Sequence, residues 1–417
     1  MRLEDHAPAR AAAEAVARRS YGKLVAFLAA RTRDVAGAED ALSEAFATAL
    51  VDWPAHGIPR SPEAWLLTVA RRRLIDSARQ RQTSTGAADH LRLLAELAAD
   101  EAGEPSVPDD RLALMFACAH PAIDVGVRAP RILQTILGFN AEDIASAFLV
   151  SPTAMGQRMV RAKSKIRQAA IPLRVPERFD LAERLDAVLE AIYAAFAEGW
   201  SDPAGTEVRR RNLAEEAIWL GRLVASLLPD EPEALGLLSL MLHAEARRGA
   251  RRSASGEYVP LAEQDPALWD ARLIDEAEAL LLRASAAGST GRYQLEAAVQ
   301  SAHVIRRRTG RSDWVAIERL YDALWALTGS PVVGINRAAA VAEINGAAAG
   351  LALLDALADD ARLTDYQPYW AARAGLLARH GAAQAADQAY ERAIGLESDP
   401  AVRAFLQQRR AALRNNQ

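Results

Sequence analysis

The chain has 417 residues, a formal net charge of −4 and a hydrophobic share of 51%. This length suits two to four domains, and the single cysteine, Cys118, excludes an intrachain disulfide and a thiolate metal cage. No stretch approaches about 18 uninterrupted apolar residues, and the N-terminus lacks the apolar core of a signal peptide. We therefore expect a cytoplasmic protein without a membrane partner. Abundant alanine and scarce strand-like alternation predict an all-α fold.

The N-terminal part predicts a helical domain over residues 10–83. Turn signals and prolines divide it into helices over roughly residues 14–33, 36–52 and 61–81. Ser61 and Pro62 suit the start of the third helix, which has an inward-facing apolar stripe. A cluster of arginines in and just before this helix suits a phosphate backbone. These candidate DNA-binding residues are Arg60, Arg71, Arg72, Arg73 and Arg79.

Residues 84–108 have the composition of a linker, because they are acidic, rich in small residues and without a sustained apolar face. A short helix over residues 90–99 is compatible with the pattern. This acidic segment separates two basic regions, so the modest net charge conceals two positive patches.

Residues 109–175 predict a second helical domain that ends in two closely spaced helices. Asn140 caps a short helix over residues 140–150, and Ser151 followed by Pro152 begins a basic helix. The spacing is typical of a helix-turn-helix, whose second helix enters the major groove. An ordinary helical hairpin with a solvated basic face is the alternative. The candidate DNA-binding residues here are Ser151, Thr153, Gln157, Arg158, Arg161 and Lys165.

Residues 178–417 predict a helical-repeat domain similar to tetratricopeptide repeats. The last hairpin turns at His380–Gly381 and fills the repeat positions with Trp370, Ala374, Leu377, Ala386, Tyr390 and Ala393. The preceding hairpin turns at Asn345–Gly346, and its small positions are expected at Asn336, Ala340, Glu343 and Ala352. Stacked hairpins form a concave surface for a protein or peptide ligand, with a packed lid as the alternative. The basic segment 247–256 is expected to be an exposed loop.

Three segments, in order, resemble bacterial sigma-70 family factors of the extracytoplasmic-function group. They are AEDALSEAF (38–46), AWLLTVARRRLID (64–76) and EDIASAFLVSPTAMGQRMVRAKSKIR (142–167). Nearly the whole chain is similar to the subgroup with a C-terminal tetratricopeptide-like domain. The chain departs from the family's usual residues at Ser43 and Arg72, and at Gly156 in the basic helix.

This resemblance implies three domains and a linker. They are a region 2 domain (10–83), a linker (84–108), a region 4 helix-turn-helix domain (109–175) and the tetratricopeptide-like domain (178–417). It implies docking on core RNA polymerase through Asp40, Glu44 and Phe46. The helix containing Arg71–Arg73 would read the −10 promoter element, with the loop 53–62 capturing a flipped base. The basic helix would read the −35 element.

We therefore expect a transcription initiation factor that binds core RNA polymerase and promoter DNA, with its activity modulated by its own C-terminal domain. The alternative is a helix-turn-helix regulator that acts without polymerase and senses a peptide through the repeat domain. A repeat scaffold whose basic helices meet RNA or protein is a third possibility. Phosphate-loop, dinucleotide, zinc-protease and serine-hydrolase motifs are absent from the sequence, so we expect no enzyme activity, no cofactor and no metal. Cys118 and His120 are read as core residues.

Overall fold

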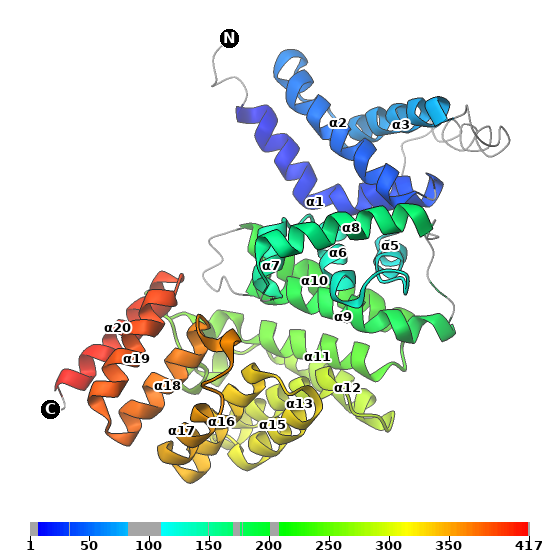
Figure 1. Ribbon diagram of the computed structural model, residues 1–417. Coiled ribbons are helices and arrows are strands. Elements are labelled where there is room, and N and C mark those ends of the chain that lie inside the picture. Colours follow the sequence, from blue (N-terminus) through cyan, green and yellow to red (C-terminus); the bar gives the residue numbers. More distant parts are fainter. Residues whose placement is uncertain are drawn as a thin grey trace. The chain divides into compact units, whose positions relative to one another are not determined.

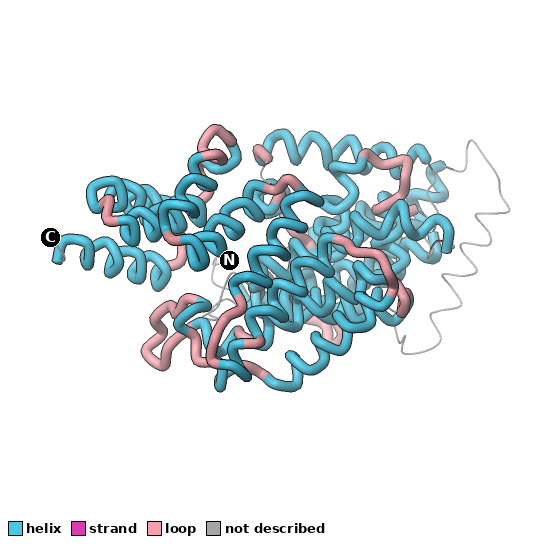
Figure 2. Tube along the Cα trace, turned by 90° about the horizontal axis from the view of Figure 1, so that it is seen from below, coloured by secondary structure: helices cyan, strands magenta, loops and turns pink. Residues whose placement is uncertain are grey.

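The computed structural model describes residues 7–32, 34–81, 110–148, 150–169, 176, 178–200 and 208–415. Within these ranges it consists of helices and loops, without a strand, which confirms the all-α prediction (Figure 2). The fold divides into two compact units, residues 1–198 and 199–417. Among the described helices, none is both long and apolar enough to cross a membrane. The expected linker helix, over residues 90–99, lies outside the described residues.

In the described part of the first unit, three helices precede residue 82 and five follow residue 109; Figure 1 shows their arrangement. In chain order they are α1 (Ala7–Thr32), α2 (Val35–His56), α3 (Pro62–Arg81), α5 (Arg111–Cys118), α6 (Val125–Leu137), α7 (Ala141–Ala147), α8 (Pro152–Ala169) and α9 (Arg178–Trp200). Helix α2 packs on α1 and α3. Helices α2 and α3 start within one residue of the positions expected from sequence, whereas α1 starts at Ala7, well before the expected residue 14.

Two details of the first unit differ from expectation. Helix α2 continues to His56 with Pro54 inside its last turn, so only residues 57–61 remain as a loop. Helix α9 also lies almost entirely in the first unit, although residues from 178 onward were assigned to the repeat domain. Arg128 of α6 donates hydrogen bonds to the carbonyl oxygens of Ile123 and Glu183, so α9 is tied to α6.

The second unit is a succession of helices, most of which pack on their neighbours in sequence. The α-helices are α10 (Val208–Leu227), α11 (Pro232–Ala246), α12 (Ala271–Ala286), α13 (Arg292–Val304), α14 (Arg306–Thr309), α15 (Trp314–Thr328), α16 (Pro331–Asn345), α17 (Ala347–Asp355), α18 (Gln367–His380), α19 (Ala383–Leu396) and α20 (Pro400–Asn415). Short 3₁₀ turns are η3 (Arg248–Arg251), η4 (Leu261–Glu263), η5 (Pro266–Leu268) and η6 (Ala361–Leu363).

The expected hairpins of this unit form, but the register of one of them differs. Helix α18 ends at His380 with Gly381 in the left-handed conformation, at the turn expected from sequence. In the preceding hairpin, Asn336 and Ala352 are exposed. The close approach is made by Gly350, where an added Cβ would lie 2.7 Å from the Ala338 carbonyl oxygen. The turn and the buried position of Ala340 were therefore predicted well, whereas Asn336, Glu343 and Ala352 are exposed and do not pack as expected.

The basic segment 247–256 is an exposed loop only at residues 254–256, whereas its arginines are at least partly buried. Arg247 is only 6% exposed and donates a hydrogen bond to Gln300 of α13. The Arg251 guanidinium lies 3.7 Å from the centre of the Trp200 ring. Arg252 pairs with Asp399. The local sequence is that of a solvated loop, but its arginines have aromatic and polar partners in distant parts of the chain. Local sequence cannot reveal such partners.

Candidate functional site

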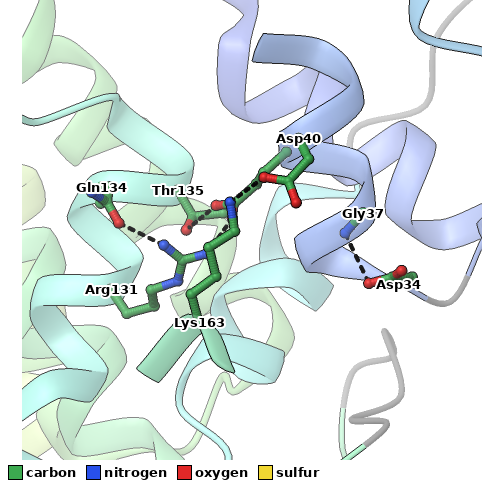
Figure 3. Close-up of polar contacts among 8 residues, drawn as sticks. Asp34, Gly37, Asp40, Arg131, Gln134, Thr135 and Lys163 are labelled. Atoms are coloured by element: carbon green, nitrogen blue, oxygen red, sulfur yellow. Dashed lines mark hydrogen bonds and ion pairs between the residues drawn. The ribbon is translucent and has the colours of Figure 1, made fainter. Parts of the chain in front are cut away.

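The candidate site lies where α2 meets α6 and α8, and a buried carboxylate is at its centre (Figure 3). Glu39 of α2 is 4% exposed. One of its oxygens accepts a hydrogen bond from the Thr135 hydroxyl at 2.8 Å, and the other pairs with the guanidinium of Arg131. Arg131 also donates to the side-chain oxygen of Gln134. Both oxygens of the buried carboxylate are therefore satisfied by α6.

Lysine 163 of α8 joins the same cluster from the other side. Its ammonium group pairs with Asp40 (Figure 3). The same group lies 3.8 Å from the Glu39 carboxylate. The Lys163 side chain is 33% exposed and that of Asp40 is 50% exposed. The adjacent carboxylates of α2 are thus each paired with a cation from residues beyond position 110.

Burial and the Glu39 charge shift the pKa values of the groups in and around this cluster. Burial by itself would lower the pKa of Arg131, but the adjacent Glu39 carboxylate raises that pKa above its ordinary value. Tyr21 of α1 is mostly buried near the pair, and its pKa is raised to about 12 by this partial burial and then by the charge of Glu39. Burial also raises the pKa of the Cys118 thiol to about 12. These neighbours stay neutral at physiological pH, so the ion pair carries the charge of this region.

A glycine brings α1 into direct contact with the backbone of α6. An added Cβ on Gly22 would lie 2.1 Å from the carbonyl oxygen of Ile136 and 2.8 Å from its Cα. Any larger residue would have to push the two helices apart, because both obstructing atoms belong to the backbone. Gly22 and the Glu39 cluster therefore hold α1 and α2 tightly on α6 and α8.

Sequence reasoning missed the four residues that build this contact, which are Glu39, Arg131, Thr135 and Lys163. A signal was present for Glu39. It lies on the apolar face of α2, three residues before the buried Leu42 and four after the buried Val35. A carboxylate at such a position requires a buried partner. The partner could not be named, because α6 lies 92 positions further along the chain.

The residues expected to bind polymerase have partners within the first unit. Asp40 pairs with Lys163, as described above. Glu44 lies 3.3 Å from the guanidinium of Arg73, with both side chains more than half exposed. The half-buried ring of Phe46 packs against that of Tyr21, with centroids 6.3 Å apart.

The arginines expected to meet DNA near α3 are spread over different environments. Arg60 and Arg72 are exposed, as is Arg73, which pairs with Glu44. Arg71 is half-buried, with its guanidinium 5.3 Å from the centre of the Phe27 ring. Arg79 belongs to α3, but its side chain lies outside the described part.

Helix α8 has one buried and one exposed face. The buried face comprises Met155, Met159, Ala162 and Ile166. Each of the residues expected to bind DNA is exposed: Ser151, Thr153, Gln157, Arg158, Arg161 and Lys165. Ser151 also caps the helix by accepting a hydrogen bond from the backbone of Ala154 at 3.3 Å. Val160, which sequence reasoning did not single out, is 71% exposed on the same side as Gln157 and Arg161.

The helix before α8 is short and its connection to α8 is tight. The side chain of Asn140 caps α7 by accepting a hydrogen bond from the Asp143 backbone at 2.8 Å. Ile144 and Ala145 are buried, and α7 packs on α8. The exposed side of α8 is therefore presented by a pair of helices that pack on each other.

Comparison with known proteins shows which family the chain belongs to. Over 375 residues it is 40% identical to an uncharacterised protein of Rhizobium meliloti (strain 1021), and the match covers 88% of each chain. A family model described as sigma-70 region 2 matches residues 16–84, which include most of α1 and all of α2 and α3. The chain belongs to the family of that rhizobial protein and contains a sigma-70 region 2 domain.

The sigma-70 region 2 domain thus contains Glu39 and Asp40, whereas Arg131 and Lys163 lie outside it. A second model, a family of unknown function (DUF6596), matches residues 184–285. That match begins in α9 and ends in α12, and so includes the buried Arg247. No solved structure gives a significant match to the chain.

Proposed function

We propose that this protein is a sigma factor of the extracytoplasmic-function group, which docks on core RNA polymerase and directs it to promoters. The observation that carries the proposal is the sigma-70 region 2 match over α1, α2 and α3. The exposed Arg60, Arg72 and Arg73 supply positive charge on and beside α3 for melted −10 DNA. Ile58, in the loop before α3, is 44% exposed and offers an apolar surface for an unstacked base.

We further propose that α7 and α8 form a helix-turn-helix that reads the −35 element. Gln157 and Arg161 are exposed at helical spacing, and their side chains suit the edges of adenine and guanine. Val160 lies between them in sequence and is suited to contact a thymine methyl group. Arg158 and Lys165 flank this face and suit phosphates.

The second unit is proposed to be a tetratricopeptide-like domain that modulates initiation and takes a protein or peptide ligand. Helices packed in sequence order and small residues at the α16–α17 and α18–α19 contacts support this assignment. Because α9 packs with the first unit, a truncation that tests this role should end after Glu198.

The decisive experiment is transcription from genomic DNA by core polymerase, with and without the protein. Promoter-specific transcripts that require the protein would support the proposal. Absence of both core binding and specific transcripts would refute it. If the protein binds DNA specifically but never core polymerase, it is instead a regulator of the helix-turn-helix type. Comparing the full chain with residues 1–198 in the same assay tests the modulating role of the second unit.

A further inference from the structure

The contact between α2 and the helices α6 and α8 has the properties of a specific latch. Its centre is an ion pair that is buried on both sides, with Glu39 6% and Arg131 2% exposed at the side chain. Thr135 satisfies the second oxygen of Glu39 at 2.8 Å. Lys163 adds a partly exposed pair with Asp40 at the edge. A buried carboxylate whose two oxygens both have partners favours one arrangement of the surfaces that carry it.

We propose that this contact is an autoinhibitory latch, which holds the region 2 domain against α6 and α8 until core polymerase displaces it. The proposal rests on the proposed sigma-factor function. The contact joins residues from two segments with different expected functions. Asp40 belongs to the segment expected to dock on polymerase, and Lys163 belongs to the helix expected to read DNA. In the latched state Asp40 and Lys163 are paired with each other, so neither side chain is available to polymerase or to DNA.

Dimensions show why the latch must open. The −10 and −35 elements lie about 25 base pairs apart, or roughly 85 Å along DNA at 3.4 Å per base pair. Helices α3 and α8 both pack on α2, a helix of 22 residues. A helix of that length spans only about 33 Å. The places where α3 and α8 contact α2 therefore lie within about 33 Å of each other, far less than the separation of the two elements on a straight promoter.

Charge complementarity explains how polymerase could open the latch. The α2 carboxylates Glu39 and Asp40 are paired with cations in the latched state. A basic polymerase surface would offer the same kind of partner and compete for Asp40, the more exposed of the two. Opening exposes Arg131 and Thr135 to water, so the hydration free energy that they lose in the latched state is regained.

The proposal predicts a wedge variant that opens the latch without touching any charged residue. Gly22→Ala places a Cβ against the backbone of Ile136. Gly375→Ala is the matched control, because that glycine is also helical and nothing lies within 4 Å of an added Cβ. Lys163→Glu is a second opening variant that places a carboxylate beside Asp40 and Glu39. Circular dichroism of each full-length variant checks that the helices remain.

Two spin labels on the full chain measure the opening. Val51→Cys on α2 and Val125→Cys on α6 are 76% and 72% exposed in the native residues, whereas the native Cys118 is buried beyond the reach of a label. We expect one narrow distance distribution in the otherwise wild-type chain and in Gly375→Ala. Gly22→Ala and Lys163→Glu should give longer, broader distributions. Identical distributions in all four proteins would overturn the latch.

Binding to core polymerase then tests inhibition. If nine-tenths of the free molecules are latched, opening tightens the apparent affinity of Gly22→Ala about tenfold. Equal affinities of wild type and Gly22→Ala, with clearly different label distances, would overturn inhibition while the sigma-factor function stands. If neither wild type nor either opening variant binds core polymerase, the proposed function itself fails, and inhibition fails with it.

Discussion

Glu39 of α2 and Arg131 of α6 lie 92 positions apart and form an ion pair in which both side chains are almost fully buried. A buried pair of this kind contributes little net stability compared with apolar residues of the same shape, because both charges lose their hydration. Its loss is costly, however, when only one partner is removed. The pair therefore makes the contact between α2 and α6 selective rather than merely strong.

Removing the charge of Arg131 should weaken this contact strongly. Arg131→Met leaves Glu39 buried without its cation, and such a loss costs about 3–5 kcal/mol. We expect faster hydrogen exchange in α2 and α6 of the full chain, measured by mass spectrometry. Arg73→Ala is the control, since its pair with Glu44 is exposed and worth roughly 0–1 kcal/mol. Equal exchange in the two variants would contradict the central role of Glu39.

Promoter specificity should depend on the exposed face of α8. Alanine at Arg161 or Gln157 should cost about 1–3 kcal/mol on the preferred −35 sequence and relax specificity at one base. Arg158→Ala should weaken all sequences alike and flatten the salt dependence, as expected for a phosphate contact. Arg319→Ala, an exposed arginine of α15, controls for loss of surface charge. Fluorescence anisotropy with base-substituted promoters at several salt concentrations separates these outcomes.

The effect predicted for Val160 is an apolar contact, which a change in charge cannot explain. Val160→Ser removes both methyl groups and with them the apolar surface, so discrimination of thymine from uracil should fall at one promoter position. The affinity for a site in which that thymine is already uracil should stay the same. If the variant loses affinity equally on both sites, Val160 does not contact a methyl group.

Mild acid should destabilise the second unit through buried histidines. Burial, and then the charge of Arg247, lower the pKa of His243 to about 3. Glu278 lies 3.4 Å from the His243 ring, but its side chain is 42% exposed, so burial dominates. Burial also lowers the pKa of His303 to about 4. The unfolded chain binds more protons than the native one below about pH 6.5, so stability falls as the pH drops towards 4.

The measurement is the urea midpoint of the second unit between pH 7 and pH 4.5, followed by hydrogen exchange in α11 and α13. His243→Leu should show a smaller loss between these pH values than the wild type. His380→Gln should behave as the wild type does, because His380 is exposed at the end of α18. If His243→Leu and the wild type lost the same stability between these pH values, the native pKa of His243 would not be lowered by burial and the prediction would be wrong.

Packing in the second unit should be sensitive at Gly350. An alanine there would bring its Cβ to 2.7 Å from the Ala338 carbonyl oxygen and from the Ala342 Cβ. Overpacking of this kind costs about 1–3 kcal/mol, enough to outweigh the gain in helix propensity. Gly395→Ala in α19 is the control, since its surroundings are open. We expect a lower melting temperature for Gly350→Ala alone; equal melting temperatures would contradict the close approach of α16 and α17.

The sequence by itself determined the helices and most of their ends. Ser151 with Pro152, Asn140 and Gly381 act on their own backbone neighbours, so the start of α8, the cap of α7 and the end of α18 could be predicted. The apolar spacing of α8 likewise fixed which of its faces is buried, and the segments around α2 and α3 pointed to sigma-70 region 2. All of these features depend on residues within about one or two helical turns.

Tertiary structure alone decided which distant side chains meet. The pairing of Glu39 with Arg131, the approach of Gly22 to Ile136 and the burial of Arg247 all join separate elements. Local pattern can mark a carboxylate on an apolar face as needing a partner, but any cation in the chain satisfies that need equally well. The choice depends on how the apolar faces of α1, α2, α6 and α8 pack, because the hydrophobic effect is non-directional and only shape complementarity selects one arrangement.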